Sequence, residues 1–288
     1  MATDRPRPRT VRQRRLASQL RRLRTDAQLS REDVEDRTGV NEGTLYRIET
    51  ARSRPQKRTL LSLLDLYDVS GPLRADLLDI AKTADNLGWL RPYHAELPEE
   101  YAAYISFEAE AKALRNYQSL FIPGLLQTED YARAVIRGAL PTDTLTTVEQ
   151  RIQARIERQK LLDGESPVEL WTILDEAAIR RLTGGPRIMR EQLAYLIETA
   201  ALPNVTLQVL PYEAGAHPGM PGSFVYMEFA DPHDPDLVYV DTQAGDLFLE
   251  SDSELKIYAS MFNHLRAMAL SPPRTTTMIS SRIKETEI

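Results

Sequence analysis

Helix signals near the N-terminus constrain this chain more than any other feature. Leu16, Leu20 and Leu23 recur at helical spacing within an arginine-rich segment, which places one apolar stripe on an otherwise polar helix. Similar short signals follow, so residues 15–67 are predicted to form five short helices. The pattern indicates a small helical bundle.

A tight turn is predicted between two of these helices. Ser30 can cap the first of the pair, and the Asp33 carboxylate can return a hydrogen bond to the Ser30 amide. Gly39 can take the left-handed conformation that ends a helix, and Asn41 can cap the next one. Two short helices joined in this way form the helix-turn-helix that proteins use to read DNA. A generic helical bundle is the alternative.

The second helix of this pair is expected to turn a polar face outward. Leu45 and Ile48 recur at the inward spacing. The outward positions, which meet the major groove in such a motif, are then Glu42, Gly43, Thr44 and Arg47.

Charge is distributed unevenly along the chain. Residues 1–58 hold 16 Arg and Lys against 8 Asp and Glu, and the remainder holds 20 against 34. A basic N-terminal part on an acidic body is typical of a nucleic-acid-binding domain joined to a domain with another task. Residues 1–14 contain five arginines, two prolines and no apolar run, so we expect a disordered basic arm there.

Composition limits where the protein acts. The chain has no Cys, which excludes disulfides and thiol catalysis. No apolar run has the length of a secretory signal or of a membrane-spanning helix. We therefore expect a cytoplasmic protein without membrane contact.

The predicted helix-turn-helix also carries residues at characteristic positions, namely Gly39, Val40, Leu45, Arg47, Ile48, Glu49 and Pro55. In this pattern residues 16–69 resemble the Xre-type, phage-repressor-like helix-turn-helix family. The resemblance implies that Arg31, where the family usually has Gln, binds a phosphate. It also implies a structural ion pair between Glu49 and Arg24.

Matching positions in that family imply which residues contact DNA. Base contacts are expected from Asn41, Glu42, Thr44 and Arg47. The Arg47 guanidinium can bind guanine O6 and N7, and Glu42 can accept from a cytosine amine, whereas Gly43 has no side chain for readout. A solvated helix face is the alternative. Phosphate contacts are expected from Ser30, Arg31, Arg52, Arg54, Lys57 and Arg58.

The rest of the chain is long enough for a second domain. We expect a mainly α N-terminal domain followed by an α+β C-terminal domain, with an arm at 1–14, the helix-turn-helix domain at 15–84, a linker at 85–104, the α+β domain at 105–270 and a tail at 271–288. Helices are predicted at 101–118, 128–138, 146–162, 175–182, 186–200 and 251–268, and strands at 205–210, 224–229 and 237–240. The tail is expected to be disordered or to pair as a peptide.

Several strings in the second domain also match a family pattern. They are 121–128, 131–133, Arg151 and Arg155 with 158–159, 174–178, Met189 with 192–193, 203–205 and 238–240. Across residues 104–270 the chain resembles the C-terminal domain of the WhiJ-like, or Scr1-type antitoxin-like, regulators of actinobacteria. One departure is Asp241, where Glu is expected. The resemblance implies a transcription regulator whose second domain binds a small protein, often encoded beside it, or another ligand.

No catalytic signature is visible in the second domain. It has no nucleophile elbow, no phosphate loop and no histidines at metal-ligand spacing, so we expect no catalytic residue, no cofactor and no metal. Arg151, Arg155 and Arg158 share one helical face. They can bind an acidic partner or pair with Glu149 and Glu157.

Two functions fit these observations. The first is a homodimeric DNA-binding transcription regulator, a repressor in the simplest case, that reads a palindromic operator and receives a signal in its second domain. The second is an antitoxin-like protein that mainly sequesters a small protein partner and binds DNA to regulate its own synthesis. Co-purification of a small protein favours protein sensing, whereas a pocket lined by aromatic side chains favours a small ligand.

Overall fold

The computed structural model describes residues 11–83, 97–139, 144–231, 234–242 and 245–286, and its contacts divide the chain into two compact units. The first unit contains α1 (Val11–Asp26), α2 (Arg31–Thr38), α3 (Glu42–Glu49), α4 (Lys57–Leu66) and α5 (Gly71–Thr83), and also takes in α6 (Glu99–Glu110). The second unit contains the remaining elements.

The first unit packs its short helices around one apolar core. Leu20 of α1, Leu45 of α3 and Leu63 of α4 are completely buried there, as the inward spacing predicts. With 8 to 10 residues, α2, α3 and α4 are too short to be stable alone, so the shared core holds them in place.

Helix α1 begins earlier than the sequence suggested. Residues 11–14 were expected in the disordered arm, but they form the first turn of α1. Arg14 is buried, and its guanidinium carbon lies 5.4 Å from the centre of the Phe107 ring. Arginine has good helix propensity, so an arginine-rich sequence did not exclude a helix. Residues 1–10 of the arm lie outside the described residues.

The second unit is built on a mixed sheet with strand order β3-β2-β1-β4-β5-β6. Its strands are β1 (Ala111–Gln118), β2 (Glu169–Asp175), β3 (Val205–Leu210), β4 (Phe224–Phe229), β5 (Leu237–Val240) and β6 (Leu247–Leu249). Strands β1, β2 and β3 are parallel, whereas β4, β5 and β6 add as antiparallel neighbours. This agrees with an α+β class and adds a parallel half that was not predicted.

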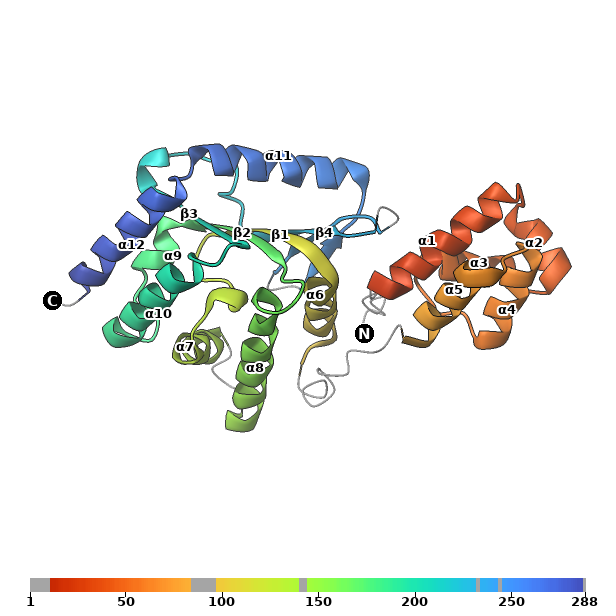
Figure 1. Cartoon of the computed structure of the whole chain (residues 1–288), viewed down its shortest axis with the longest axis horizontal. Coiled ribbons are helices and arrows are strands. Elements are labelled where there is room, and N and C mark those ends of the chain that lie inside the picture. The colour runs from red at the N-terminus through yellow and green to blue at the C-terminus, as the bar shows by residue number, and fades with distance from the viewer. Residues whose placement is uncertain (1–10, 84–96, 140–143, 232–233, 243–244, 287–288) are drawn as a thin grey trace. The chain divides into compact units, whose positions relative to one another are not determined.

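Helices cover both faces of the sheet (Figure 1). One face carries α11 (Asp252–Met268), whose Phe262 and Leu265 pack with Tyr117, Ile173 and Phe224 of the strands. The other face carries α7 (Glu129–Ala139), α8 (Leu145–Arg158) and α10 (Pro186–Thr199). Short helical turns join these elements: η1 (Gly124–Leu126), η2 (Gln159–Leu162), α9 (Glu176–Arg180) and η3 (Tyr212–Ala214).

Two predictions about this unit were wrong. Residues 101–118 were expected to form one helix, but α6 ends at Glu110 and the next eight residues form β1, where pairing with β2 and β4 overrides the helix propensity of Ala111 and Ala113. The tail is not a peptide-like segment. It forms α12 (Pro272–Glu285), in which Ile279 is completely buried.

None of the helices within the described ranges combines the length and the apolar character that a membrane crossing requires.

Candidate DNA-binding surface

The helix-turn-helix forms through the caps that the sequence indicates. The Ser30 hydroxyl accepts from the Asp33 amide at 3.0 Å, and the Asp33 carboxylate accepts from the Ser30 amide at 2.7 Å. The Ser30 hydroxyl also donates to the Asp33 carboxylate at 2.7 Å, and this bond, followed by the one from the Ser30 amide, holds the pKa of Asp33 below its usual range. Gly39 ends α2 with a φ of 70°, a conformation that favours glycine. The predicted turn is confirmed.

A buried carboxylate ties α1, α2 and α3 together. The Glu49 side chain is completely buried and receives the Arg24 Nε at 2.6 Å and the Arg31 Nε at 2.9 Å. The hydrogen bond that Arg24 donates to Glu49 is the main cause that raises the pKa of Arg24. The structural ion pair implied for Arg24 and Glu49 is therefore confirmed, and Arg31 shares it.

The outer face of α3 presents polar side chains over this frame. Glu42 and Arg47 are exposed and Thr44 is half-buried. The Arg47 Nη2 donates to the Thr44 hydroxyl at 3.1 Å, which holds the guanidinium along the helix surface. These three residues stand where a recognition helix places its base contacts.

Asn41 forms the predicted cap of α3, and this role competes with its predicted base contact. Its Oδ1 accepts from the Gly43 amide at 3.0 Å, and its Nδ2 donates to Glu35 at 3.0 Å. Both ends of the amide are thus engaged in capping α3, so a base contact would have to replace one of these bonds. Gly43 protects this cap, because a Cβ there would lie 3.2 Å from the Asn41 Oδ1.

The predicted phosphate ligands divide into two groups. The Ser30 hydroxyl is engaged in the α2 cap, and the Arg31 Nε is engaged with Glu49. The four residues that follow α3 are exposed: Arg52, Arg54, Lys57 and Arg58. Lys57 and Arg58 begin α4, whose N-cap residue makes no side-chain capping bond. Cations at this end are repelled by the positive end of the helix dipole, and a bound phosphate would offset that repulsion.

Sequence reasoning missed Tyr46. Its side chain is 40% exposed on α3, and the guanidinium carbons of Arg31 and Arg52 lie 5.2 and 5.5 Å from its ring centre. These are cation–π distances. A large aromatic residue beside Arg47 was a usable signal, because the inward spacing of Leu45 and Ile48 leaves it outside the core.

The arginines of α8 do not form the open face that was expected. Arg158 is only 3% exposed, and a Cβ on Gly124 would lie 3.5 Å from its Nη1. Arg155 donates to Gln127 at 3.0 Å. Arg151 is half-buried. Glu149 pairs with Arg133, and Glu157 pairs with Lys160.

Two of the strings that carried the second resemblance, 121–128 and 192–193, contact one another. The Gln127 side chain is completely buried and donates to the Ile122 carbonyl at 2.5 Å. Buried Gln192 of α10 accepts from the Thr128 amide at 2.7 Å and donates to the Leu126 carbonyl at 2.6 Å. These hydrogen bonds fix the backbone of the segment between β1 and α7, which is a structural role.

The described residues include no cluster of three or more His, Asp or Glu side chains arranged to hold a metal ion. His94 and His233 lie outside those residues. His217 approaches Asp175 at 3.6 Å, and His264 is exposed on α11.

Comparison with known families gives two matches. A model described as a helix-turn-helix domain matches residues 15–77, the segment that forms α1 to α4 and most of α5. A model described as a domain of unknown function, DUF5753, matches residues 101–281. Neither the curated proteins nor the solved structures gave a match. Because the second model covers well over half of the chain, the protein belongs to the DUF5753 family and carries a helix-turn-helix domain before it.

Proposed function

We propose that the protein is a sequence-specific DNA-binding transcription regulator, in the simplest case a repressor, that reads its site with α3. The observation that carries the proposal is the outer face of α3. It presents Glu42, Thr44 and Arg47 over a frame fixed by the buried Glu49, and preorganised side chains are what base readout requires.

Phosphate binding is assigned to the basic residues around this face. Arg31 and Arg52 stack on Tyr46, and Lys57 and Arg58 begin α4. Each phosphate contact makes the logarithm of affinity fall with the logarithm of salt concentration by about 0.9. These four residues should therefore give a steep salt dependence.

We also propose that the regulator acts as a homodimer on a palindromic operator. One recognition helix contacts few base pairs, and two copies reading half-sites one helical turn apart give the specificity that a genome requires. The DUF5753 domain is proposed to receive the signal, without catalysis. The likeness to Xre-type heads and to WhiJ-like, Scr1-type regulators supports a small protein encoded beside the gene as one source of that signal.

The proposal is tested by recovering the DNA that the full-length protein binds in cells and sequencing it. We expect a shared inverted repeat whose half-site centres are about 10 bp apart or a multiple of that. The Arg47→Ala variant should enrich it more weakly and should accept other base pairs at the position that faces residue 47. Lys82→Ala, which removes an exposed cation of α5, is the matched control and should enrich the same sites. Fragments without a common motif would contradict the proposal.

A further inference from the structure

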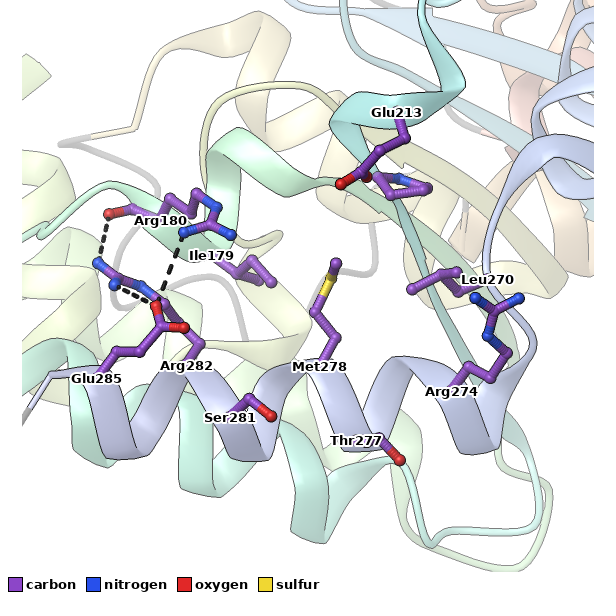
Figure 2. Close-up of a pocket in the computed structure, with 11 residues that line it drawn as sticks. Ile179, Arg180, Glu213, Leu270, Arg274, Thr277, Met278, Ser281, Arg282 and Glu285 are labelled. Carbon is purple, nitrogen blue, oxygen red and sulfur yellow. Dashed lines mark hydrogen bonds and ion pairs between the residues drawn. The ribbon is translucent and has the colours of Figure 1, made fainter.

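A hollow of about 550 Å³ opens in the second unit between α9, η3 and α12. Its apolar lining includes Ile179, Leu270 and Met278. Figure 2 shows Met278 pointing from the middle of α12 into the hollow, with Glu213 across from it. Arg274 lies on the same helix, nearer its N-terminal end. A volume of this size is typical of small-molecule sites.

Helix α12 is held at both ends of the hollow. Near its start, the Thr275 hydroxyl accepts from the Val209 amide at 3.0 Å. Near its end, Arg282 donates to the Arg180 carbonyl at 3.3 Å. These two bonds position α12 as one side of the hollow.

A buried carboxylate positions the opposite wall. Glu176 is 2% exposed and sits where β2 ends and α9 begins. One oxygen receives the Arg180 Nε at 2.5 Å, and the other accepts from the Tyr212 amide at 2.8 Å. The second bond fixes η3, which carries Glu213. The wall is therefore built by a buried charge and does not depend on surface side chains alone.

The charges around the hollow are of two kinds. Arg180 and Arg282 both pair with Glu285, which lies at 3.7 Å from Arg180 and 3.0 Å from Arg282. In contrast, Glu213 and Arg274 have no hydrogen-bond or ion-pair partner within the described part of the chain. The two groups that remain for a ligand are thus one anion and one cation beside an apolar surface.

We propose that this hollow binds a short apolar peptide of two or three residues. Its ammonium group pairs with Glu213, its carboxylate pairs with Arg274, and its side chains cover Ile179, Leu270 and Met278. The site lies at the carboxyl ends of β2 and β3, where open sheets with parallel strands commonly bind ligands. This inference relies on the proposed function only for the idea that such a ligand is a signal.

The test follows the Met278 methyl resonance in full-length protein labelled at the methionine methyl groups, assigned with Met278→Leu. The probes are the dipeptides Leu-Leu, Val-Phe and Ala-Ile. A saturable shift of Met278 is expected with at least one of them. Glu213→Gln and Arg274→Gln should each weaken that binding about tenfold or more, whereas Lys256→Gln on α11, an exposed cation away from the hollow, should leave it unchanged.

Two probes that lack one or both charges separate the peptide from other ligands. N-acetyl-Leu-Leu-amide, which lacks both charges, should bind at least tenfold more weakly than Leu-Leu, and so should octanoate, which lacks the ammonium group. Equal binding of either probe, or no shift of Met278 with any dipeptide at 10 mM, would overturn the proposal. DNA binding is measured separately on the recovered operator, so a failure of this site and a failure of DNA recognition give different results.

Discussion

The buried Glu49 makes a quantitative prediction about the recognition frame. Glu49→Gln removes the charge that Arg24 and Arg31 share, while the side chain keeps its shape. Breaking a buried ion pair from one side costs about 3–5 kcal/mol. Arg24 and Arg31 have side-chain exposures of 12% and 28%, so water offsets part of the cost and we expect about 3 kcal/mol.

Hydrogen exchange measured by mass spectrometry on the full-length chain reports this loss of stability for each helix and strand separately. A change of about 3 kcal/mol corresponds to about 150-fold less protection of the slow amides in α1 and α3. Amides of β1, β2 and β3, in the other unit, should not change. Glu42→Gln neutralises an exposed acid of the same helix and is the matched control.

The result that would refute the reasoning is a Glu49→Gln variant with less than fivefold loss of protection in α1 and α3. An equal loss in the Glu42→Gln control would refute it too, because the effect would then follow helix charge and not the buried pair. Loss of protection in β2 would show that the variant disturbs the whole chain.

Three further predictions concern other contacts. Tyr46→Ala should weaken operator binding about 5- to 30-fold by releasing the two stacked arginines, whereas Tyr46→Phe should bind like the native chain. Equal affinities of Tyr46→Ala and the native chain in fluorescence anisotropy would contradict this. Because its pKa is lowered, Asp33 stabilises the α2 cap at pH values above the ordinary Asp pKa of about 4, and this stabilisation is lost as the pH falls. The difference in melting temperature between the native chain and Asp33→Asn should therefore shrink from pH 7 toward pH 3. A difference that stays constant with pH would contradict this role of Asp33. Ile279→Asp buries a charge and should lower the free energy of unfolding of the second unit by more than about 3 kcal/mol. Hydrogen exchange should then show a loss of protection in α12 but not in α3. Unchanged protection in α12 would show that the helix is not docked through this residue.

The helix-turn-helix could be predicted from the sequence because its signals are local. Ser30, Asp33, Gly39 and Asn41 each act within four residues of their own position, so caps and turns follow from spacing alone. What spacing does not show is competition for the same side chain. Asn41 carries both a cap and a matching base-reading position, and only the structure shows that its amide is engaged.

The errors in the second unit have a different cause, because they depend on partners distant in sequence. Strand β1 reads as helix until β2 and β4 lie on its two sides. The sequence of the tail is mostly polar, and its helix is stabilised by one buried stripe, centred on Ile279, that packs against the rest of the unit. Arg158 looks like a surface charge until Gly124 lies against it. The hollow beside α12 was not visible for the same reason.

The central claim, that α3 reads DNA, is tested most directly by Arg47→Ala on the recovered operator. The native chain should discriminate at the base pair facing Arg47 by about 1–3 kcal/mol, or about 5- to 150-fold. In the variant this discrimination should disappear at that position alone, with the salt dependence unchanged. Affinity and base preference equal to those of the native chain would contradict the assignment of α3 as the recognition helix.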